Sequence, residues 1–511
     1  MKKILYVSLD ERPCNYNFPT MIADSTDIEM IYPPIELLGV KKKPANTNKL
    51  WDWVFENVDK ADGAILSIDM LLYGGIVPSR LHSLSIEECE QRLENITKLK
   101  SIKPDLKIFA FNLIMRCPSY SSSEEEPDYY EDYGRLIFRT GYINHKKDLG
   151  IAEDEEIKEL KDINKKLPKH ILNDYVGRRK INREVNRRVI DYVKKGFIDF
   201  LVIPQDDSSP YGYTAIDQQY VRESISKNGL NFKIYMYPGA DEVGCTLLAR
   251  MINEDKNICP KVYVRYSSTK GPFLIPLYED RILNESVKYQ VTCAGGQICS
   301  SLSEADIVLA INCPGGQMME AMEEDKRDRG YNVDRNIVEF VNYIDYVVNE
   351  VKKPCIVGDV AFTNGGDLEL VGLMRQKKLL FKVAAYAGWN TSSNTLGTCI
   401  AQGMLYSIYG SNQSHKDFLA LRYVEDVGHC SFERQLVANE ILPGMGFSDF
   451  NIDGQRGKVS KIVMEELIKF TEENLNYDNY HINITDCYMP WSRMFEVGLK
   501  VNLVENTDGL K

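Results

Sequence analysis

Short apolar runs that end in acidic residues and glycines recur along this chain. The first, Ile4–Ser8, lies in KILYVSLDERPCN and is followed at once by Asp10, Glu11 and Arg12. The same pattern returns in AILSIDMLLYGG, FLVIPQDDSSPYG, KIYMYPGADE and CIVGDVAFTNGGD. Apolar runs of this length are typical of buried parallel strands, and ligands of α/β proteins bind at the carboxyl ends of such strands. The pattern therefore predicts an α/β fold with an acidic, oxygen-rich pocket at the strand ends.

Strand and helix patterns alternate through the first half of the chain, which is typical of a parallel sheet covered by helices on both faces. Helical patterns such as NTNKLWDWVFENVDKA lie between the apolar runs, and Ser85 precedes Glu88 at the spacing of a capping box. The predicted strands are Ile4–Ser8, Ile28–Tyr32, Ala64–Ile68, Lys107–Leu113, Phe197–Pro204 and Lys233–Tyr237.

One long connection separates Leu113 from Phe197. It begins with the polar, tyrosine-rich RCPSYSSSEEEPDYYEDYG and continues as a highly charged helical pattern. A connection of this length is normally a lid, a small subdomain or an interaction arm. We expect a lid or helical insertion near residues 116–196, in which Tyr129, Tyr130 and Tyr133 would close over a ligand.

The alternation restarts at Lys261, and the second half resembles a flavodoxin-like unit. Its predicted strands are Val262–Tyr266, Tyr289–Cys293, Ile307–Ile311, Cys355–Gly358 and Phe381–Tyr386. We predict two doubly wound (Rossmann/flavodoxin-like) domains at residues 1–256 and 257–410, and a mixed C-terminal region at residues 411–511 that is helical and ends in a strand. The alternative is an elaborated (β/α)8 barrel, but about eleven strands are too many for an eight-stranded barrel.

Charge and composition restrict the partners and the compartment. The formal net charge is -12 and no basic stripe offsets it, which argues against a nucleic-acid or anionic-membrane partner. No segment approaches the ~18 apolar residues that span a bilayer, and the first apolar run is too short for a signal peptide. The 12 cysteines include no CxxC pair, which fits reduced thiols. We expect a cytoplasmic protein, with a homo-oligomer as a possible state.

Four aspartates that follow predicted strands are the candidate catalytic residues: Asp10, Asp69, Asp206 and Asp241. For Asp10, a structural alternative is a salt bridge to Arg12 before a turn at Pro13. Adjacent side chains of a strand point to opposite faces. We therefore expect only one acid of each pair, Asp206/Asp207 and Asp241/Glu242, to face the pocket, while the other caps the next helix.

Other polar and aromatic residues at the strand ends are candidates for substrate binding, because amides, carboxylates and an aromatic face are what a sugar requires. These candidates are Arg12, Tyr73, Arg80, Asn112, Arg116, Asp207, Glu242, Asn312, Asp359, Asn364, Asp367, Trp389, Asn390 and Asn394. Asn and Asp also favour turns and helix caps for purely local reasons, so Asn394 has a helix cap as its alternative role.

Several common motifs are missing from the sequence. No GxGxxG follows the first strand, and no Walker A, HExxH, GxSxG or EF-hand pattern occurs. The six histidines are scattered without metal-ligand spacing. We expect no cofactor, although the strand-end acids leave an all-oxygen Mg²⁺ or Mn²⁺ site open.

Three long motifs, LDERPCN, DMLLYGGIVPSR and GWNTSSNTLGT, resemble those of an uncharacterised bacterial family, domain of unknown function family 4127. The resemblance extends over nearly the whole chain. It implies a bacterial origin and an association with sugar-uptake genes, and it assigns no catalytic residues.

These observations favour a carbohydrate-active enzyme, a glycoside hydrolase that acts on a small sugar or glycoside. Such a reaction needs one carboxylic acid to protonate the leaving oxygen and one carboxylate as nucleophile or base. We expect Asp206 or Asp241 as the acid, and Asp10 or Asp69 as its partner. The alternatives are a divalent-metal-dependent isomerase or hydrolase of a sugar derivative, and a non-catalytic sugar-binding protein.

Overall fold

The computed structural model describes residues 1–505, except the side chains of residues 324 and 325. The chain forms two compact units. Unit 1 comprises residues 1–11, 28–244 and 278–280, and unit 2 comprises residues 12–27, 245–277 and 281–511, of which 506–511 lie outside the described part. The predicted limits at residues 256 and 410 stay a prediction.

Unit 1 is built on a six-stranded parallel sheet with the order β2-β1-β3-β4-β5-β6. The side chains of β3 are entirely buried, as expected for a strand covered on both faces. All six strands predicted for the first half are present. They are β1 (Lys3–Val7), β2 (Glu29–Ile31), β3 (Gly63–Ser67), β4 (Lys107–Phe111), β5 (Phe200–Val202) and β6 (Ile234–Tyr235).

Helices connect these strands. The predicted capping box is present at the start of α5, where the Ser85 hydroxyl accepts from the Glu88 amide and the Glu88 carboxylate accepts from the Ser85 amide. The helices are α3 (Thr47–Asn57), α4 (Ile68–Tyr73), α5 (Ile86–Leu93), α6 (Asn95–Ile102), α7 (Tyr130–Asp148), α8 (Asp154–Lys166), α9 (Lys169–Lys194) and α10 (Tyr213–Lys227).

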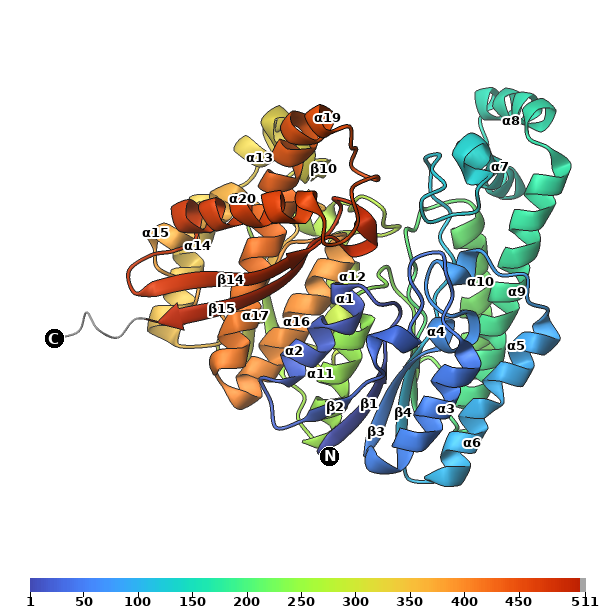
Figure 1. Ribbon diagram of the computed structural model, residues 1–511, viewed down its shortest axis with the longest axis horizontal. Helices are drawn as coiled ribbons and strands as arrows, with labels where there is room; N and C mark the ends of the chain where they lie inside the picture. Colours follow the sequence, from blue (N-terminus) through green and yellow to red (C-terminus); the bar gives the residue numbers. More distant parts are fainter. Residues whose placement is uncertain (506–511) are drawn as a thin grey trace. The chain divides into compact units, whose positions relative to one another are not determined.

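The long connection from β4 to β5 contains α7, α8 and α9 and has its own aromatic core. In Figure 1, α7 and α8 lie on the side of unit 1 toward which its strands point. Tyr130 is buried in this core and its hydroxyl donates to the Pro118 carbonyl at 2.9 Å. The expected role of Tyr130 in closing over a ligand is therefore wrong, because its ring stabilises the insertion itself.

Unit 2 contains a five-stranded parallel sheet with the order β13-β11-β9-β7-β8. In chain order this is the 2-1-3-4-5 arrangement of flavodoxin-like sheets, and it confirms the predicted doubly wound fold against the barrel alternative. Two short strands of the same unit, β10 and β12, form a separate parallel pair. The strands are β7 (Lys261–Tyr266), β8 (Gln297–Ile298), β9 (Ile307–Asn312), β10 (Met319–Glu320), β11 (Cys355–Asp359), β12 (Phe362–Thr363) and β13 (Ala385–Ala387).

The strand predicted at Tyr289–Cys293 is wrong, because these residues end the helix α12 (Leu283–Cys293). Leu283, Val287 and Val291 are buried at helical spacing, and a short apolar run does not by itself distinguish this pattern from a strand. The strand of this part of the sheet is β8, which follows two glycines.

The rest of unit 2 is largely helical and ends in an antiparallel hairpin. The hairpin strands are β14 (Tyr480–Tyr488) and β15 (Gly498–Glu505), which contact α20 and α17 respectively (Figure 1). The helix α17 continues directly as a π-helix, η7 (Val424–Glu433). The helices are α1 (Pro13–Tyr16), α2 (Phe18–Ala23), α12, α13 (Arg329–Asn332), α14 (Ile337–Asp345), α15 (Leu368–Gln376), α16 (Ser392–Tyr409), α17 (Gln413–Tyr423), α18 (Arg434–Leu436), α19 (Leu442–Met445) and α20 (Lys458–Asn474).

The helix α11 (Val243–Asp255) carries the chain from unit 1 into unit 2. Within residues 1–505, no helix combines the length and the apolar character needed to cross a membrane.

Candidate functional site

Six charged residues meet beyond β3, β4 and β5 in unit 1, and we call them the arginine–acid cluster. Arg80 Nη2 lies 2.5 Å from Asp206 Oδ2, and Arg116 Nη1 lies 3.1 Å from Asp207 Oδ2. The members of the cluster are Arg80, Arg116, Glu125, Glu126, Asp206 and Asp207. Three successive strands therefore position the four members that the sequence pattern had singled out.

Glu125 and Glu126 join the two arginines. Glu125 Oε2 lies 3.0 Å from Arg80 Nη1 and 3.2 Å from Arg116 Nη2. Glu126 Oε1 accepts from Arg116 Nε at 2.7 Å and lies 3.5 Å from Arg80 Nη1. Sequence analysis missed these two glutamates. They belong to the acidic run SSSEEEP, close after Arg116, which by composition resembles an ordinary exposed loop.

Asp206 and Asp207 both face the cluster, although we expected only one of them to do so. Asp207 has a φ of 35°, in the left-handed region, so the alternation of a strand does not continue through this residue. Asp is one of the few residues other than Gly that adopt this region with some frequency. A backbone of this kind at a charged cluster is the type of local strain that gathers at functional sites.

The two aspartates are partly accessible, while Arg80 and Glu126 are buried. The side chains of Asp206 and Asp207 are 12% and 21% exposed, against 2% for Arg80. Burial raises the pKa of Asp207 to about 7, against the opposing effect of Arg116, and the charge of Asp206 raises it further. Asp206 is held in direct contact with a guanidinium group. The two adjacent carboxyl groups therefore lie against different arginines, Arg80 and Arg116.

Asp69 and Asn112 form a second polar group at the ends of β3 and β4. Asn112 Nδ2 donates to Asp69 Oδ2 and Oδ1 at 3.2 and 3.3 Å, and the Leu113 amide donates to Oδ2 at 2.9 Å. Asn186 Nδ2 in turn donates to Asn112 Oδ1 at 2.6 Å. Burial raises the pKa of Asp69 to about 7, and the charge of Asp206 adds to this effect. Asp69 is thus electrostatically linked to the cluster.

Three other predicted acids of unit 1, Asp10, Asp241 and Glu242, are buried. Glu242 Oε2 accepts from the Ala240 amide at 2.9 Å, which is a local role of the kind expected for one acid of the pair. The ring of Tyr73 stacks on His82 at a centroid distance of 4.5 Å. The catalytic or binding roles of Asp10, Asp241 and Tyr73 stay predictions.

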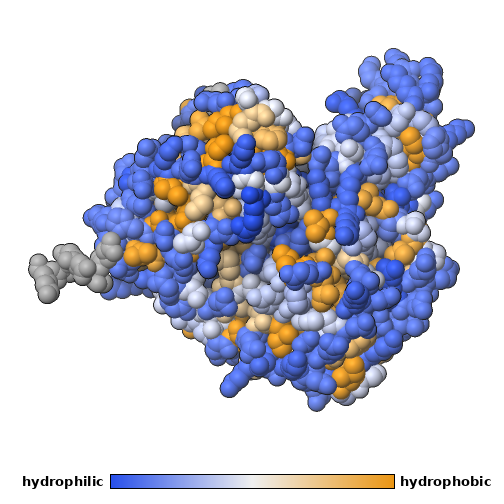
Figure 2. All heavy atoms as spheres, viewed as in Figure 1, coloured by the Kyte–Doolittle hydropathy of each residue, from blue (hydrophilic) through white to orange (hydrophobic). Residues whose placement is uncertain are grey.

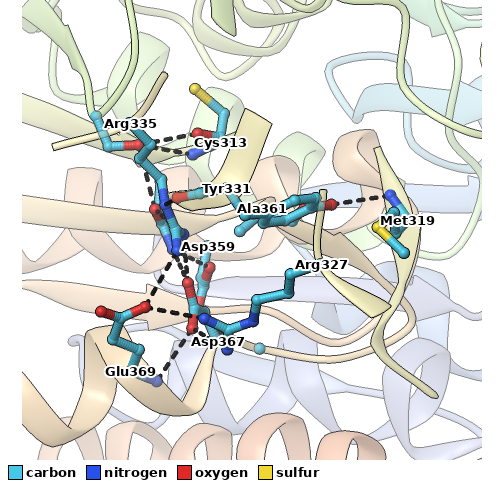
Figure 3. A network of polar contacts seen from close by, with 12 residues as sticks. Cys313, Met319, Arg327, Tyr331, Arg335, Asp359, Ala361, Asp367 and Glu369 are labelled. Carbon is cyan, nitrogen blue, oxygen red and sulfur yellow. Dashed lines mark hydrogen bonds and ion pairs between the residues drawn. The ribbon is translucent and has the colours of Figure 1, made fainter. Parts of the chain in front are cut away.

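In unit 2, the candidates Asn312, Asp359 and Asp367 belong to one buried network. Figure 3 shows Asp359 and Asp367 in this network. Asp359 Oδ2 accepts from the Tyr386 hydroxyl at 2.8 Å and from the Asp367 amide at 2.7 Å, while Asp359 Oδ1 accepts from Asn312 Nδ2 at 2.9 Å. Asp367 forms an ion pair with Arg335 and accepts from the Glu369 amide at 3.0 Å as the N-cap of α15.

This network fixes the start of α15 against the ends of β9 and β11. Buried polar groups that are fully hydrogen-bonded stabilise one conformation of a core. The contacts of Asp359 and Asp367 therefore indicate a structural role, and Arg327 and Glu369 lie at the more exposed rim of the network.

Three further candidates, Arg12, Trp389 and Asn390, line a small cavity of about 10 Å³ in unit 2. The second part of the motif LDERPCN, from Arg12 onward, and the motif GWNTSSNTLGT therefore lie in the same unit. Arg12 lies over the Trp491 ring at 4.5 Å. Asn390 Oδ1 accepts from Asn394 Nδ2 at 2.9 Å, so these two candidates contact each other.

Asn364 has a φ of 63° and its Nδ2 donates to Glu320 Oε2 at 2.9 Å. Asn364 therefore follows β12 directly in the chain and contacts β10 through Glu320. Among residues 1–505, excluding the two side chains that are not described, no group of three His, Cys, Asp or Glu side chains is arranged to hold a metal ion.

Comparison with known proteins places the chain in a family. No curated protein matches the sequence. One solved structure that matches is the α,α-trehalose 6-phosphate synthase from Burkholderia multivorans, with 9% identity over 78% of this chain and 79% of that chain and a TM-score of 0.15. A TM-score this low carries no argument about fold or function. The family model described as "Protein of unknown function (DUF4127)" matches residues 4–500, so the chain belongs to the DUF4127 family.

Proposed function

We propose that this protein is a carbohydrate-active hydrolase of the glycoside hydrolase type, with Asp206 and Asp207 as its two reacting carboxyl groups. One observation carries the proposal. Two adjacent, partly exposed aspartates bind different arginines, and burial raises the pKa of Asp207 to about 7. A pair of carboxyl groups whose environments differ in this way is what acid–base catalysis at neutral pH requires.

The roles follow from the environments. Asp207 retains its proton near pH 7 and serves as the general acid, because an effective catalytic acid has a pKa near the working pH. Asp206, whose Oδ2 lies 2.5 Å from Arg80 Nη2, is the nucleophile or base. This assignment replaces our expectation of Asp206 or Asp241 as the acid and of Asp10 or Asp69 as the partner. Asp69 instead orients Asn112 behind the pair.

In the proposed reaction, the carboxylic proton of Asp207 passes to the glycosidic oxygen as the bond from this oxygen to the anomeric carbon breaks. Asp206 either attacks the anomeric carbon or takes a proton from the water that attacks it. Water supplies the new hydroxyl group in both cases, and the products are the free sugar and the released alcohol.

The charges of the cluster favour a neutral substrate. Two guanidinium groups face four carboxyl groups, so a phosphate or carboxylate on the sugar would meet more negative than positive charge. Hydroxyl groups both donate and accept, and they can bind acids and guanidinium groups alike. The chemistry of the cluster thus supports an uncharged sugar or glycoside.

A second candidate, a sugar-binding protein without catalysis, is favoured by the ion pairs of both aspartates. Each pair occupies one carboxylate oxygen with an arginine, and paired acids are also common in purely structural networks. Saturable binding of a sugar without any turnover would support this candidate.

The two candidates are separated by assaying a panel of 4-nitrophenyl glycosides with the wild type and with D206N and D207N. The proposal predicts that D207N lowers kcat by about 10²–10⁴-fold, and that D206N lowers it comparably or more. D191N is the matched control, because Asp191 is an acid paired with Arg187 on the surface of α9. Wild-type turnover in both D206N and D207N would overturn the proposal.

A further inference from the structure

A second cavity, of about 440 Å³, lies in unit 2 between α15, η7, α18 and α20, outside the arginine–acid cluster. Its volume falls within the range of small-molecule pockets. The proposed function does not use this cavity, and none of its lining residues was singled out in the sequence.

Glu433, the last residue of the π-helix η7, lines this cavity and is only 3% exposed. Its Oε2 atom has no hydrogen-bond partner within the described part of the chain. A buried carboxylate oxygen without a donor is costly, and each such atom in a folded protein calls for an explanation. π-Helical segments are also frequent at functional sites.

The walls of the cavity near Glu433 are aromatic and aliphatic. The rings of Phe432 and Phe470 lie with centroids 5.6 Å apart, and Phe432 is 45% exposed. Leu368 and Leu436 complete the apolar lining. Aromatic faces attract ammonium groups through their quadrupole, and aliphatic walls suit the carbon chain that such a group carries.

The charges around the cavity are negative. Glu466 and Glu473 of α20 line it together with Glu433, against one cation, Lys469. Lys469 Nζ already donates to Glu466 Oε1 at 2.6 Å. Burial and the charge of Glu466 raise the pKa of Glu433 to about 7. An ammonium ion beside Glu433 would favour its carboxylate form, and Glu473 adds a further negative charge, so the cavity suits a cationic ligand.

We propose that this cavity binds a small organic ammonium ion, a primary amine on a short apolar chain. The ammonium group donates to Glu433, and the chain lies against Phe432, Phe470 and the two leucines. Apolar walls distinguish this site from one for a hydrated metal ion, which takes oxygen ligands on all sides. The proposal is independent of the glycoside hydrolase assignment, since the two sites share no residue.

The test is isothermal titration calorimetry of the full chain with n-butylammonium chloride, with 1-butanol and sodium butyrate as ligands matched in size. The expected result is saturable binding of butylammonium, with 1-butanol and butyrate bound at least about tenfold more weakly, as expected for loss of a charge-assisted hydrogen bond.

Two variants and a control accompany this titration. E433Q is expected to weaken binding of butylammonium about tenfold or more. F432A removes an exposed ring, so it tests the aromatic wall with little risk to folding. E440Q is the matched control, because Glu440 is an exposed glutamate on the neighbouring π-helix η8 (Val437–Ile441) and does not line this cavity. Equal affinity for butylammonium and 1-butanol, or unchanged binding in E433Q, would overturn the proposal.

Discussion

Asp206 and Asp207 are adjacent in the chain, yet their carboxylates contact different arginines, Arg80 at 2.5 Å and Arg116 at 3.1 Å. Asp207 has a left-handed backbone with a φ of 35°, so the side-chain alternation of an extended strand does not apply to it. Glu125 lies between the two guanidinium groups and ties the loop before α7 to the strand ends. Four predictions follow from this cluster and from the network of unit 2.

The proposed role of Asp207 predicts the pH dependence of turnover. The pKa of Asp207 is raised to about 7, so its carboxyl group is protonated below this pH and loses its proton above it. A general acid must hold its proton, and kcat should therefore fall as the pH rises through about 7. Steady-state assays from pH 5 to pH 9 measure this decrease in kcat. A kcat that rises across the same range would contradict the acid role.

Removing the charge of Arg80 should strongly destabilise unit 1. Arg80 is buried and contacts Asp206, Glu125 and Glu126. R80M removes the cation that pairs with Asp206 and one of the two that Glu125 and Glu126 contact. We expect a loss of about 3–5 kcal/mol in the free energy of unfolding. R80K keeps the positive charge but lacks the planar guanidinium group, and we expect it to lose less stability than R80M.

Urea denaturation measures both Arg80 variants. R187M is the control, because Arg187 pairs with Glu184 on the surface of α9 and its loss should cost no more than about 1 kcal/mol. If R80M were no less stable than R187M, the cluster would not contribute to the stability of the fold.

Asp69 should make the protein less stable as the pH rises. Burial raises the pKa of Asp69 from 3.8 to about 7, so between these values the folded state binds more protons than the unfolded state. The contribution of this group to stability is complete below pH 3.8 and is lost as the pH approaches 7. By linkage it amounts to at most about 4 kcal/mol.

The variant D69N isolates this effect, since asparagine imitates the neutral acid and still accepts from the Leu113 amide. D69N should gain stability relative to the wild type between pH 5 and pH 8, as measured by urea denaturation at the two pH values. If the free energies of unfolding of D69N and the wild type differed by the same amount at both pH values, the pKa of Asp69 would not be raised by folding.

Two glycines near the unit 2 network should respond in opposite directions to alanine. A Cβ atom at Gly366 would lie 2.3 Å from the hydroxyl oxygen of Tyr386, which donates to Asp359 at 2.8 Å. G366A should therefore cost about 1–3 kcal/mol. A Cβ atom at Gly372, inside α15, would meet no atom within 4 Å.

G372A should accordingly raise stability by about 0.5–1 kcal/mol, because alanine favours a helix interior over glycine. Thermal unfolding of the two variants checks the pair. Equal shifts of Tm in both variants would mean that the close approach of Gly366 to the Tyr386 hydroxyl is not needed for stability.

Much of the fold could be predicted because its signals are local. The strands β1, β3 and β9 are buried on both faces. A strand buried on both faces requires consecutive apolar residues, which are visible in the sequence. The capping box at Ser85 is equally local, since its two hydrogen bonds join residues three apart. The misread segment at Tyr289–Cys293 shows the limit, because a short apolar run fits a strand and a buried helix alike.

The meeting of residues far apart in the chain depended on tertiary structure. Residues 12–27 follow the first strand of unit 1 and yet belong to unit 2, which no pattern in LDERPCN indicates. Glu125 and Glu126 lie in a polar loop whose composition is typical of any exposed surface, and only folding brings them to Arg80 and Arg116.

The sequence alone determined the two flavodoxin-like sheets and the positions of acids and arginines at their strand ends, because strand periodicity and burial are properties of neighbouring residues. Tertiary structure decided which of these residues share a site. Asp206 and Asp207 both pair with arginines of one cluster, and the backbone of Asp207 is left-handed. Asp359 and Asp367 are instead bound by Asn312, Tyr386 and Arg335. Side-chain partners depend on contacts between distant segments, and a one-dimensional pattern does not record them.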